Sequence, residues 1–281
     1  MGSETNEEKR SFLRSINQYF ELKPVGLISK IHVYRAFVVG FFHKIFWRKR
    51  FVTIGQFLNR DSVVRYDGLL LKARAGSEDL GYYAHSAKPS TFRWFHPSSE
   101  DVVVDCGSSV GLFTMIALKN GAQVYAYEAN PKTFEVLKEN VAMNGFHKNV
   151  HIFNLGLSNQ PGEMTLYAPK HFTGTASFDI KWAENMENMD DISQFMVPVK
   201  TLDDAIGSVE KIDWLLIDVE SFEYNLLLGS LKTLGRTRNI IIEISHSQSK
   251  KVQELLEEHG FSVSDKGEKE ESVQYFLYTK V

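Results

Sequence analysis

From Asp101 onward, short apolar runs alternate with longer segments in which apolar residues recur every three or four positions. Apolar runs bounded by turn residues predict buried strands, and a spacing of three or four predicts helices with one buried side. Strands and helices that alternate in this way form a parallel sheet covered on both faces. The expected strands are 102–105, 124–127, 150–154, 214–218 and 240–244, and the expected helices are 111–120, 131–144, 201–206, 222–234 and 250–259.

The end of the chain breaks this alternation with two consecutive strands. Residues 261–264 and 273–279 are predicted to form an antiparallel hairpin around the charged loop 265–271. The pattern as a whole predicts a Rossmann-like, doubly wound α/β fold with a mostly parallel seven-stranded sheet and an antiparallel last strand. Class I methyltransferases have this layout, although other doubly wound folds can end in the same way. If the protein is a methyltransferase, the excursion 156–200 is expected to cover the molecule that accepts the methyl group.

The first 100 residues carry a different pattern. Helices are predicted at 7–20 and 28–47, with a break near Pro24 and Gly26, and the strands 62–66 and 69–73 are predicted to form a hairpin. The expected domains are a basic helical N-terminal extension (1–60) and a main domain (61–281), made of a lead-in hairpin region (61–100) and a core (101–281).

The composition is that of a globular protein. Of the 281 residues, 43% are hydrophobic and 24% are charged, which argues against disorder. The longest apolar run, 36–42, is far shorter than a membrane span, and residues 1–20 lack the apolar segment of a secretory signal. The single Cys106 suits a reducing compartment. We therefore expect a cytoplasmic protein.

Charge is distributed unevenly along the chain. The net charge is −3, yet residues 1–60 carry 11 Lys or Arg against four Glu, and residues 61–281 carry 21 against 31. Residues 22–60 contain no acidic residue, several aromatic residues and the run Arg48–Arg50. Three interpretations remain open: a helix packed on the main domain, a peripheral contact with an anionic membrane, or a polyanionic partner. Nucleic acid is disfavoured, because proteins that bind it are more often basic throughout.

The first core strand ends in the loop Asp105-Cys106-Gly107-Ser108-Ser109-Val110-Gly111. Ligands of open parallel sheets bind beyond the carboxyl ends of the strands, where small residues permit close approach and the next helix offers N–H groups. A dinucleotide site has three glycines, whereas here Ser109 stands at the second position. The loop favours a cofactor without a pyrophosphate, such as S-adenosylmethionine. Its candidate ligands are Asp105, Gly107, Ser108, Ser109 and Gly111.

The second and third core strands supply further candidates for the cofactor site. Glu128 follows the second strand, 21 residues after Gly107, where one carboxylate can accept hydrogen bonds from both hydroxyls of a ribose. Ala129 comes directly after it. Asn154 and Leu155 end the third strand, where an adenine ring would lie. We therefore expect Glu128, Ala129, Asn154 and Leu155 to contribute to cofactor binding.

Several motifs in order resemble the FkbM-type family of S-adenosylmethionine-dependent methyltransferases. Asp105-x-Gly107-x-x-x-Gly111 is followed by Tyr127-Glu128-Ala129-Asn130-Pro131. The second signature is Lys200-Thr201-Leu202-Asp203-Asp204, then Ile217-Asp218-Val219-Glu220-Ser221-Phe222-Glu223, and the strand Ile241-Ile242-Glu243-Ile244 comes last. The resemblance covers about residues 101–246. It implies methylation of a hydroxyl group, often on a sugar, lipid or secondary metabolite.

Two positions depart from the family pattern. Ser221 replaces the usual glycine, and Ala129 replaces a frequent proline. Ser221 adds bulk at a strand-to-helix turn that faces the reaction site. This departure concerns the identity of the substrate more than the fold.

Methyl transfer from a sulfonium needs an acceptor oxygen in line with the departing sulfur and a group that takes the oxygen's proton. Asp218 ends the fourth core strand and Glu220 comes two residues later. His246 follows the fifth strand, and imidazole is a base near neutral pH. Asp218, Glu220 and His246 are therefore the candidate catalytic residues, and Asp218 is also a candidate ligand of the cofactor's amino group.

Alternatively, the acidic side chains in this region bind a divalent metal ion. Asp218, Glu220 and Glu243 carry oxygen ligands of the kind that Mg²⁺ or Ca²⁺ accepts. Glu243 lies within a strand, however, and the sequence has no His/Cys cluster for zinc. We expect a site without a metal.

Three functions are compatible with the sequence. The favoured function is an S-adenosylmethionine-dependent O-methyltransferase acting on a sugar, lipid or small metabolite. The alternatives are a methyltransferase directed at nitrogen or RNA, suggested by the basic extension, and a non-catalytic nucleotide-binding module on the same fold.

Overall fold

The computed structural model describes residues 19, 21–47, 54–85, 93–186, 188–269 and 272–281. The chain forms two compact units, residues 1–92 and 93–281. The predicted helix 7–20 lies outside the described residues apart from Tyr19. None of the helices in the described part of the chain has the length and apolar character of a membrane span.

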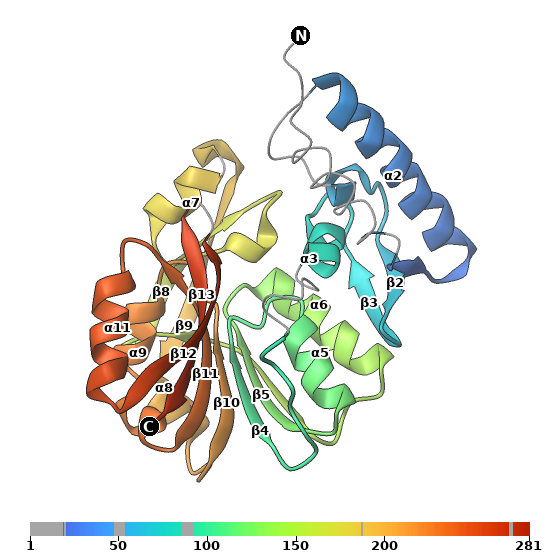
Figure 1. The fold of residues 1–281 in the computed structure, drawn as a ribbon. Coiled ribbons are helices and arrows are strands. Elements are labelled where there is room, and N and C mark those ends of the chain that lie inside the picture. Colours follow the sequence, from blue (N-terminus) through green and yellow to red (C-terminus); the bar gives the residue numbers. More distant parts are fainter. Residues whose placement is uncertain (1–18, 20, 48–53, 86–92, 187, 270–271) are drawn as a thin grey trace. The chain divides into compact units, whose positions relative to one another are not determined.

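In the first unit, one long helix lies against a small antiparallel sheet (Figure 1). The β2–β3 hairpin turns at Asp67 and Gly68, whose φ angles of 44° and 82° are the positive values that a tight two-residue turn needs. The backbone N–H of Val63 donates to Ser29 Oγ on the helix at 3.0 Å. The elements are β1 (Lys23–Pro24), α2 (Gly26–Trp47), η1 (Ile54–Phe57), β2 (Ser62–Tyr66), β3 (Leu69–Ala73) and α3 (Asp79–His85).

This unit confirms the helix and the hairpin that the sequence predicts near 28–47 and 62–73. The hairpin shares a sheet with β1 and a hydrogen bond with α2, so the hairpin groups with the extension. The compact units therefore divide after Phe92, whereas the expected boundary follows residue 60.

The second unit is built on a seven-stranded sheet with the order β12-β13-β11-β10-β4-β5-β6. Neighbouring strands from β11 to β6 pair in parallel, and β13 pairs antiparallel with both β11 and β12. The strands are β4 (Val102–Cys106), β5 (Gln123–Glu128), β6 (Val150–Asn154), β10 (Ile212–Ile217), β11 (Thr237–Ser245), β12 (Phe261–Lys269) and β13 (Val273–Lys280). This order and the single antiparallel strand confirm the class I methyltransferase fold.

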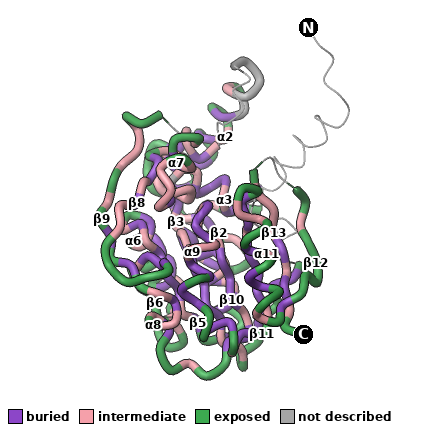
Figure 2. The backbone as a smooth tube through the Cα atoms, turned by 90° about the vertical axis from the view of Figure 1, so that its left-hand side faces the viewer, coloured by how far each residue is buried: buried purple, intermediate pink, exposed green. Residues whose placement is uncertain are grey.

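Helices cover both faces of this sheet, with α5 and α6 on one face and α9 and α11 on the other (Figure 1). The central strands are buried, whereas the edge strand β12 is mostly exposed (Figure 2). Pro131 occupies the first turn of α6, and Asn130 caps it by accepting from the N–H of Lys132. The helices are α5 (Leu112–Lys119), α6 (Pro131–Met143), α8 (Leu202–Ile206), α9 (Glu223–Leu228), α10 (Leu231–Gly235) and α11 (Ser249–Glu258).

Two predicted elements are wrong in extent. The helix expected at 222–234 is broken into α9 and α10 at Gly229, where a Cβ atom would lie 2.1 Å from the carbonyl oxygen of Ser158. Close approach of that loop therefore interrupts the helical period. The loop expected at 265–271 is shorter, because β12 continues to Lys269 against β13 through two register shifts.

The excursion between β6 and α8 forms a three-stranded sheet of its own, in the order β7-β9-β8. Ser177 lies in it and donates a hydrogen bond from Oγ to the carbonyl oxygen of Glu220 at 2.6 Å, which ties the excursion to the segment after β10. Its elements are β7 (Gly156–Leu157), β8 (Gly162–Pro169), η2 (Thr173–Thr175), α7 (Ile180–Met186), η3 (Met189–Asp191) and β9 (Ile192–Lys200).

Candidate active site

The central strands β4 and β10 end side by side at the point where the strand order reverses. Ile217 pairs with Cys106, and the N–H of Asp218 donates to the carbonyl oxygen of Cys106 at 3.0 Å. A Cβ atom on Gly107 would lie 1.8 Å from the carbonyl oxygen of Asp218. Ligands of open α/β sheets bind at such a reversal. The contact between the two strand ends therefore already requires glycine at position 107.

Gly111 and Asp105 hold the loop from behind. Gly111 has a φ of 88°, and a Cβ atom there would lie 2.4 Å from Leu137 Cδ1 on α6. Asp105 is buried and accepts a hydrogen bond from Thr114 Oγ1 at 2.5 Å. Burial raises the pKa of Asp105 to about 6. Both residues support the loop rather than line the pocket.

The Glu128 carboxylate joins the first and second strand ends. Oε2 accepts from the backbone N–H of Ser109 at 2.8 Å, and Oε1 accepts from the backbone N–H of Asn130 at 2.7 Å. Glu128 therefore both fixes the loop and presents a negative charge to the pocket.

A pocket of about 540 Å³, counting the part open to solvent, lies between these strand ends and the excursion. Of the predicted cofactor residues, six line it: Gly107, Ser109, Glu128, Ala129, Leu155 and Asp218. The other four, Asp105, Ser108, Gly111 and Asn154, are not among the lining residues.

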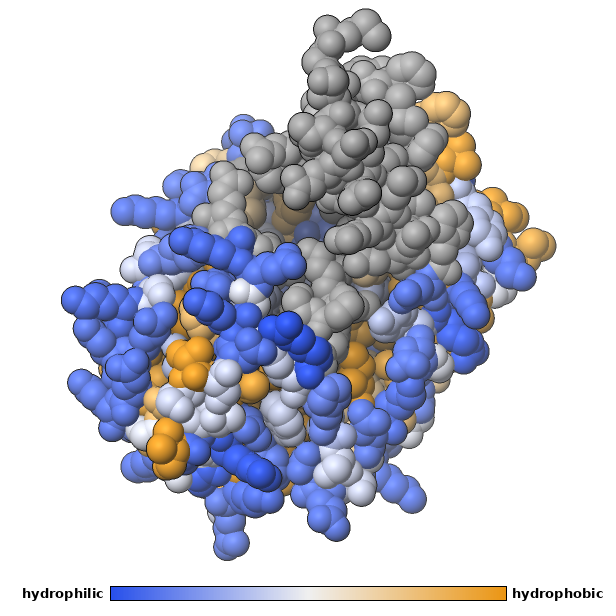
Figure 3. All heavy atoms as spheres, viewed as in Figure 1, coloured by the Kyte–Doolittle hydropathy of each residue, from blue (hydrophilic) through white to orange (hydrophobic). Residues whose placement is uncertain are grey.

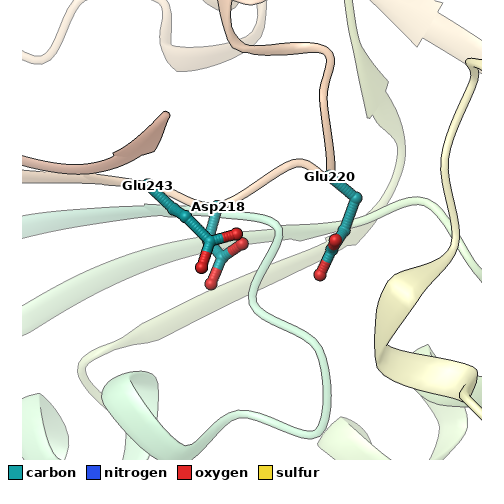
Figure 4. Close-up of side chains that lie close together, drawn as sticks. All are labelled: Asp218, Glu220 and Glu243. Atoms are coloured by element: carbon teal, nitrogen blue, oxygen red, sulfur yellow. The ribbon is translucent and has the colours of Figure 1, made fainter. Parts of the chain in front are cut away.

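Asp218, Glu220 and Glu243 form an acidic cluster at the edge of this pocket (Figure 4). One oxygen atom from each carboxyl lies within 4.8 Å of the others. Glu243 pairs across the sheet with Tyr275 of β13, whose hydroxyl donates to Asp218 Oδ2 at 2.7 Å. Figure 4 shows the carboxyls of Asp218 and Glu243 close together, with Glu220 further along the loop.

Burial dominates the titration of this cluster. It raises the pKa of Asp218, which the hydrogen bond from Tyr275 partly opposes. Burial raises the pKa of Glu243 further above its usual range, and the negative charges of Asp218 and Glu220 add to this effect. Asp218 Oδ1 is buried without a donor group among the described residues. Burial and the mutual repulsion of their charges therefore favour the neutral forms of Asp218 and Glu243.

Glu220 and Ser221 occupy a sharp turn after β10. Their φ angles are 53° and 68°, values that side-chain-bearing residues adopt only at a cost. Trp182 Nε1 donates to Glu220 Oε2 at 2.9 Å, and Ser221 Oγ donates to Ser245 Oγ at 3.2 Å. The turn is thus held from both sides and keeps Glu220 at the pocket.

His246 does not reach the pocket. It is exposed, and its backbone N–H donates to the carbonyl oxygen of Ser272 at the start of the last strand. His246 is not among the residues that line the pocket, and its catalytic role stays a prediction. Tyr275 has the place next to Asp218 instead. Only the register between β11 and β13 brings Tyr275 there, and the sequence pattern does not fix that register.

The sequence profile of the methyltransferase FkbM domain matches residues 105–263, which is more than half of the chain. The chain belongs to the FkbM methyltransferase family. Among curated relatives of this FkbM domain, methyltransferase sdnD of Sordaria araneosa is 25% identical over 202 residues, covering 59% of this chain and 75% of sdnD. Hexuronic acid methyltransferase AglP of Haloferax volcanii is 28% identical over 164 residues, covering 57% of this chain and 62% of AglP.

A shorter match connects the FkbM domain to enzymes of another kind. A tRNA (guanine(37)-N(1))-methyltransferase of Phytophthora infestans is 42% identical over 104 residues. The match covers 30% of this chain and 25% of that enzyme. The similarity is therefore limited to a shared segment and does not include the rest of that enzyme.

S-adenosylmethionine is the cofactor of this family, and the pocket suits it. The Glu128 carboxylate lines the pocket, as a ligand of ribose hydroxyls would, and Leu155 and Leu157 offer an apolar wall to a flat base. Asp218 lines the same pocket and can contact a positively charged group of the cofactor there. When bound, S-adenosylmethionine supplies a methyl group activated on a positively charged sulfur.

Proposed function

We propose that this FkbM methyltransferase transfers the methyl group of S-adenosylmethionine to a hydroxyl group on a sugar, lipid or small metabolite. The observation that carries the proposal is the Asp218–Glu243–Tyr275 arrangement at the same pocket as Glu128. An attacking hydroxyl must lose its proton, and the Asp218–Glu243 pair is a base at the edge of the pocket.

In this proposal the chain's residues have separate roles. Glu128 binds the cofactor, and Asp218 accepts the proton of the acceptor hydroxyl. Tyr275 and Glu243 position that carboxylate, while Trp182 holds Glu220 at the mouth of the pocket. Gly174, Ala176 and Phe178 of the excursion also line the pocket and provide the wall against which an acceptor would bind.

The named substrate of one relative supports an acceptor of the sugar class. AglP is by its name a hexuronic acid methyltransferase, and hexuronic acids carry ring hydroxyls. The partial match to tRNA methyltransferases supports the second candidate, an RNA acceptor. Against RNA stands the acidic balance of residues 61–281, with 21 Lys or Arg against 31 Asp or Glu.

A methyl-transfer screen tests the proposal. Full-length protein is incubated with tritiated S-adenosylmethionine and with polar glycan, lipid and RNA fractions of a cell extract. We expect label in the glycan or lipid fraction, and a loss of about a hundredfold or more in the rate of methyl transfer by Asp218→Asn. Asp190→Asn, at an exposed position, is the matched control. Label in RNA that disappears steeply with salt would establish the second candidate instead.

A further inference from the structure

Helix α2 exposes an apolar side along most of its length. Its members lie three or four positions apart, which places them on one half of the helix surface. Their exposed fractions range from 36% for Val39 to 74% for Leu27. At 1.5 Å per residue the row extends over about 22 Å. We call these residues the α2 stripe: Leu27, Ile28, Ile31, Tyr34, Val38, Val39 and Phe42.

The opposite side of α2 already forms the core of the first unit. Val33 and Ala36 are fully buried, and Ser29 accepts the hydrogen bond from Val63. A Cβ atom on Gly40 would lie 3.2 Å from Ile54 and Phe57, so the helix packs tightly there. The packing of α2 within the first unit therefore explains the buried apolar side of the helix. It does not explain why the exposed side, the α2 stripe, is apolar as well.

Other helices of the chain show what an ordinary exposed side looks like. Most exposed positions of α6 are charged and include Lys132, Glu135 and Lys138, and those of α11 include Lys250 and Glu254. In Figure 3, by contrast, hydrophobic surface appears where Figure 1 places α2. Contiguous exposed apolar surface of this kind marks an interaction site.

Positive charge accompanies the stripe. Lys30 is exposed on α2 next to the stripe, Lys23 is exposed just before the helix, and Arg48–Arg50 follow it in sequence. Residues 22–60 contain eight Lys or Arg and no Asp or Glu. An apolar side bordered by cations complements a surface that presents acyl chains below anionic headgroups.

We propose that α2 lies in the plane of an anionic lipid surface, with the α2 stripe inserted among the acyl chains and Lys23 and Lys30 at the headgroups. A second copy of the chain fits less well, because pairing two stripes would bring two acid-free, basic segments together. RNA would leave seven apolar side chains without a complementary partner. This proposal is independent of the methyl acceptor, since the stripe belongs to the first unit and the pocket lining begins at Gly107.

Vesicle flotation of the full chain tests the proposal. We expect binding to vesicles that contain phosphatidylglycerol, weaker binding to phosphatidylcholine alone, and a decrease as salt rises. Ile31→Asp and Val38→Asp should each lower partitioning into the vesicles about tenfold or more, because each replaces an aliphatic side chain inserted in the lipid with a charged one. Lys30→Glu should lower it several-fold on the anionic vesicles only.

The matched control is Met196→Asp, which adds the same charge at an apolar position of β9 that is 65% exposed. Partitioning of this variant should equal that of the wild type. Absence of wild-type binding, or an equal loss in Met196→Asp, would overturn the proposal. A wild-type dimer that Ile31→Asp dissociates would also overturn the proposal, because a second copy would then cover the stripe. So would a lower free energy of unfolding of Ile31→Asp in the absence of lipid, because the rest of the chain would then cover it.

Discussion

At the scale of single residues, Glu128 links the architecture of the site to its ligand. Replacing it with alanine removes the charge that a ribose would contact and releases the N–H groups of Ser109 and Asn130. Charge-assisted hydrogen bonds contribute about 1.5–3 kcal/mol each, so Glu128→Ala should weaken S-adenosylmethionine binding at least tenfold by calorimetry. Glu135→Ala, on the exposed side of α6, is the control. Unchanged affinity in Glu128→Ala would remove this residue from the cofactor site.

Glu223 makes stability depend on pH. It is buried at the start of α9, where Oε1 accepts from the N–H of Ser221 and burial raises its pKa to about 7. The folded state therefore binds the proton more tightly than the unfolded state, whose pKa is near 4.5. This contribution to stability is complete below about pH 4.5 and is lost as the pH rises through about 7.

Glu223→Gln removes the ionisation and keeps a carbonyl oxygen for Ser221. Urea unfolding of the wild type at about pH 5 and about pH 8 should show lower stability at the higher pH, and the variant should lose about 2–3 kcal/mol of that difference. The exposed Glu163→Gln should keep the full difference. A variant whose pH dependence equals that of the wild type would assign the effect to Asp105, Asp218 or Glu243.

The sequence identifies site residues only where the chain itself brings them to a strand end. Gly107, Glu128 and Asp218 follow directly from the alternation of strands and helices, and all three line the pocket. Tyr275 does not, because its place beside Asp218 depends on how β13 is aligned with β11. His246 also follows a strand end, yet it is exposed and does not line the pocket, because a strand end predicts an edge of the sheet and not the direction of the following side chain.

At the scale of elements, the junction of β4 and β10 depends on one missing Cβ atom. Gly107→Ala should separate the two strand ends, because the new atom would lie 1.8 Å from the carbonyl oxygen of Asp218. Gly145→Ala is a matched control, since Gly145 also has a positive φ but no atom within 4 Å of its Cβ position. We expect a loss of about 1 kcal/mol for Gly145→Ala and about 3 kcal/mol or more for Gly107→Ala in chemical unfolding. Equal losses would mean that backbone conformation alone requires glycine at position 107.

The elements that the sequence predicts best are the central strands, which are buried because helices cover both faces of the sheet. Strands β4, β10 and β11 are mostly apolar because both faces of the sheet are covered, and their predicted bounds are within a few residues of the structure. The break between α9 and α10 could not be predicted in this way. It follows from the approach of Ser158 to Gly229, two residues far apart in sequence.

At the scale of the whole molecule, every residue that lines the pocket belongs to the second unit. A protein consisting of Arg93–Val281 should therefore fold and bind S-adenosylmethionine as tightly as the full chain in calorimetry. The same protein should not float with anionic vesicles, because it lacks α2. A folded Arg93–Val281 protein that does not bind the cofactor would show that the first unit completes the pocket.

The only cysteine of the chain gives this architecture an internal reporter. Cys106 ends β4 next to Gly107, is fully buried, and has a pKa raised by burial and by the charge of Asp105. A neutral, inaccessible thiol reacts slowly with alkylating reagents, so the rate of its modification measures how often the β4–β10 junction opens. Ligands that close the pocket should slow this labelling, which allows acceptor candidates to be screened by mass spectrometry without an assay for methylation.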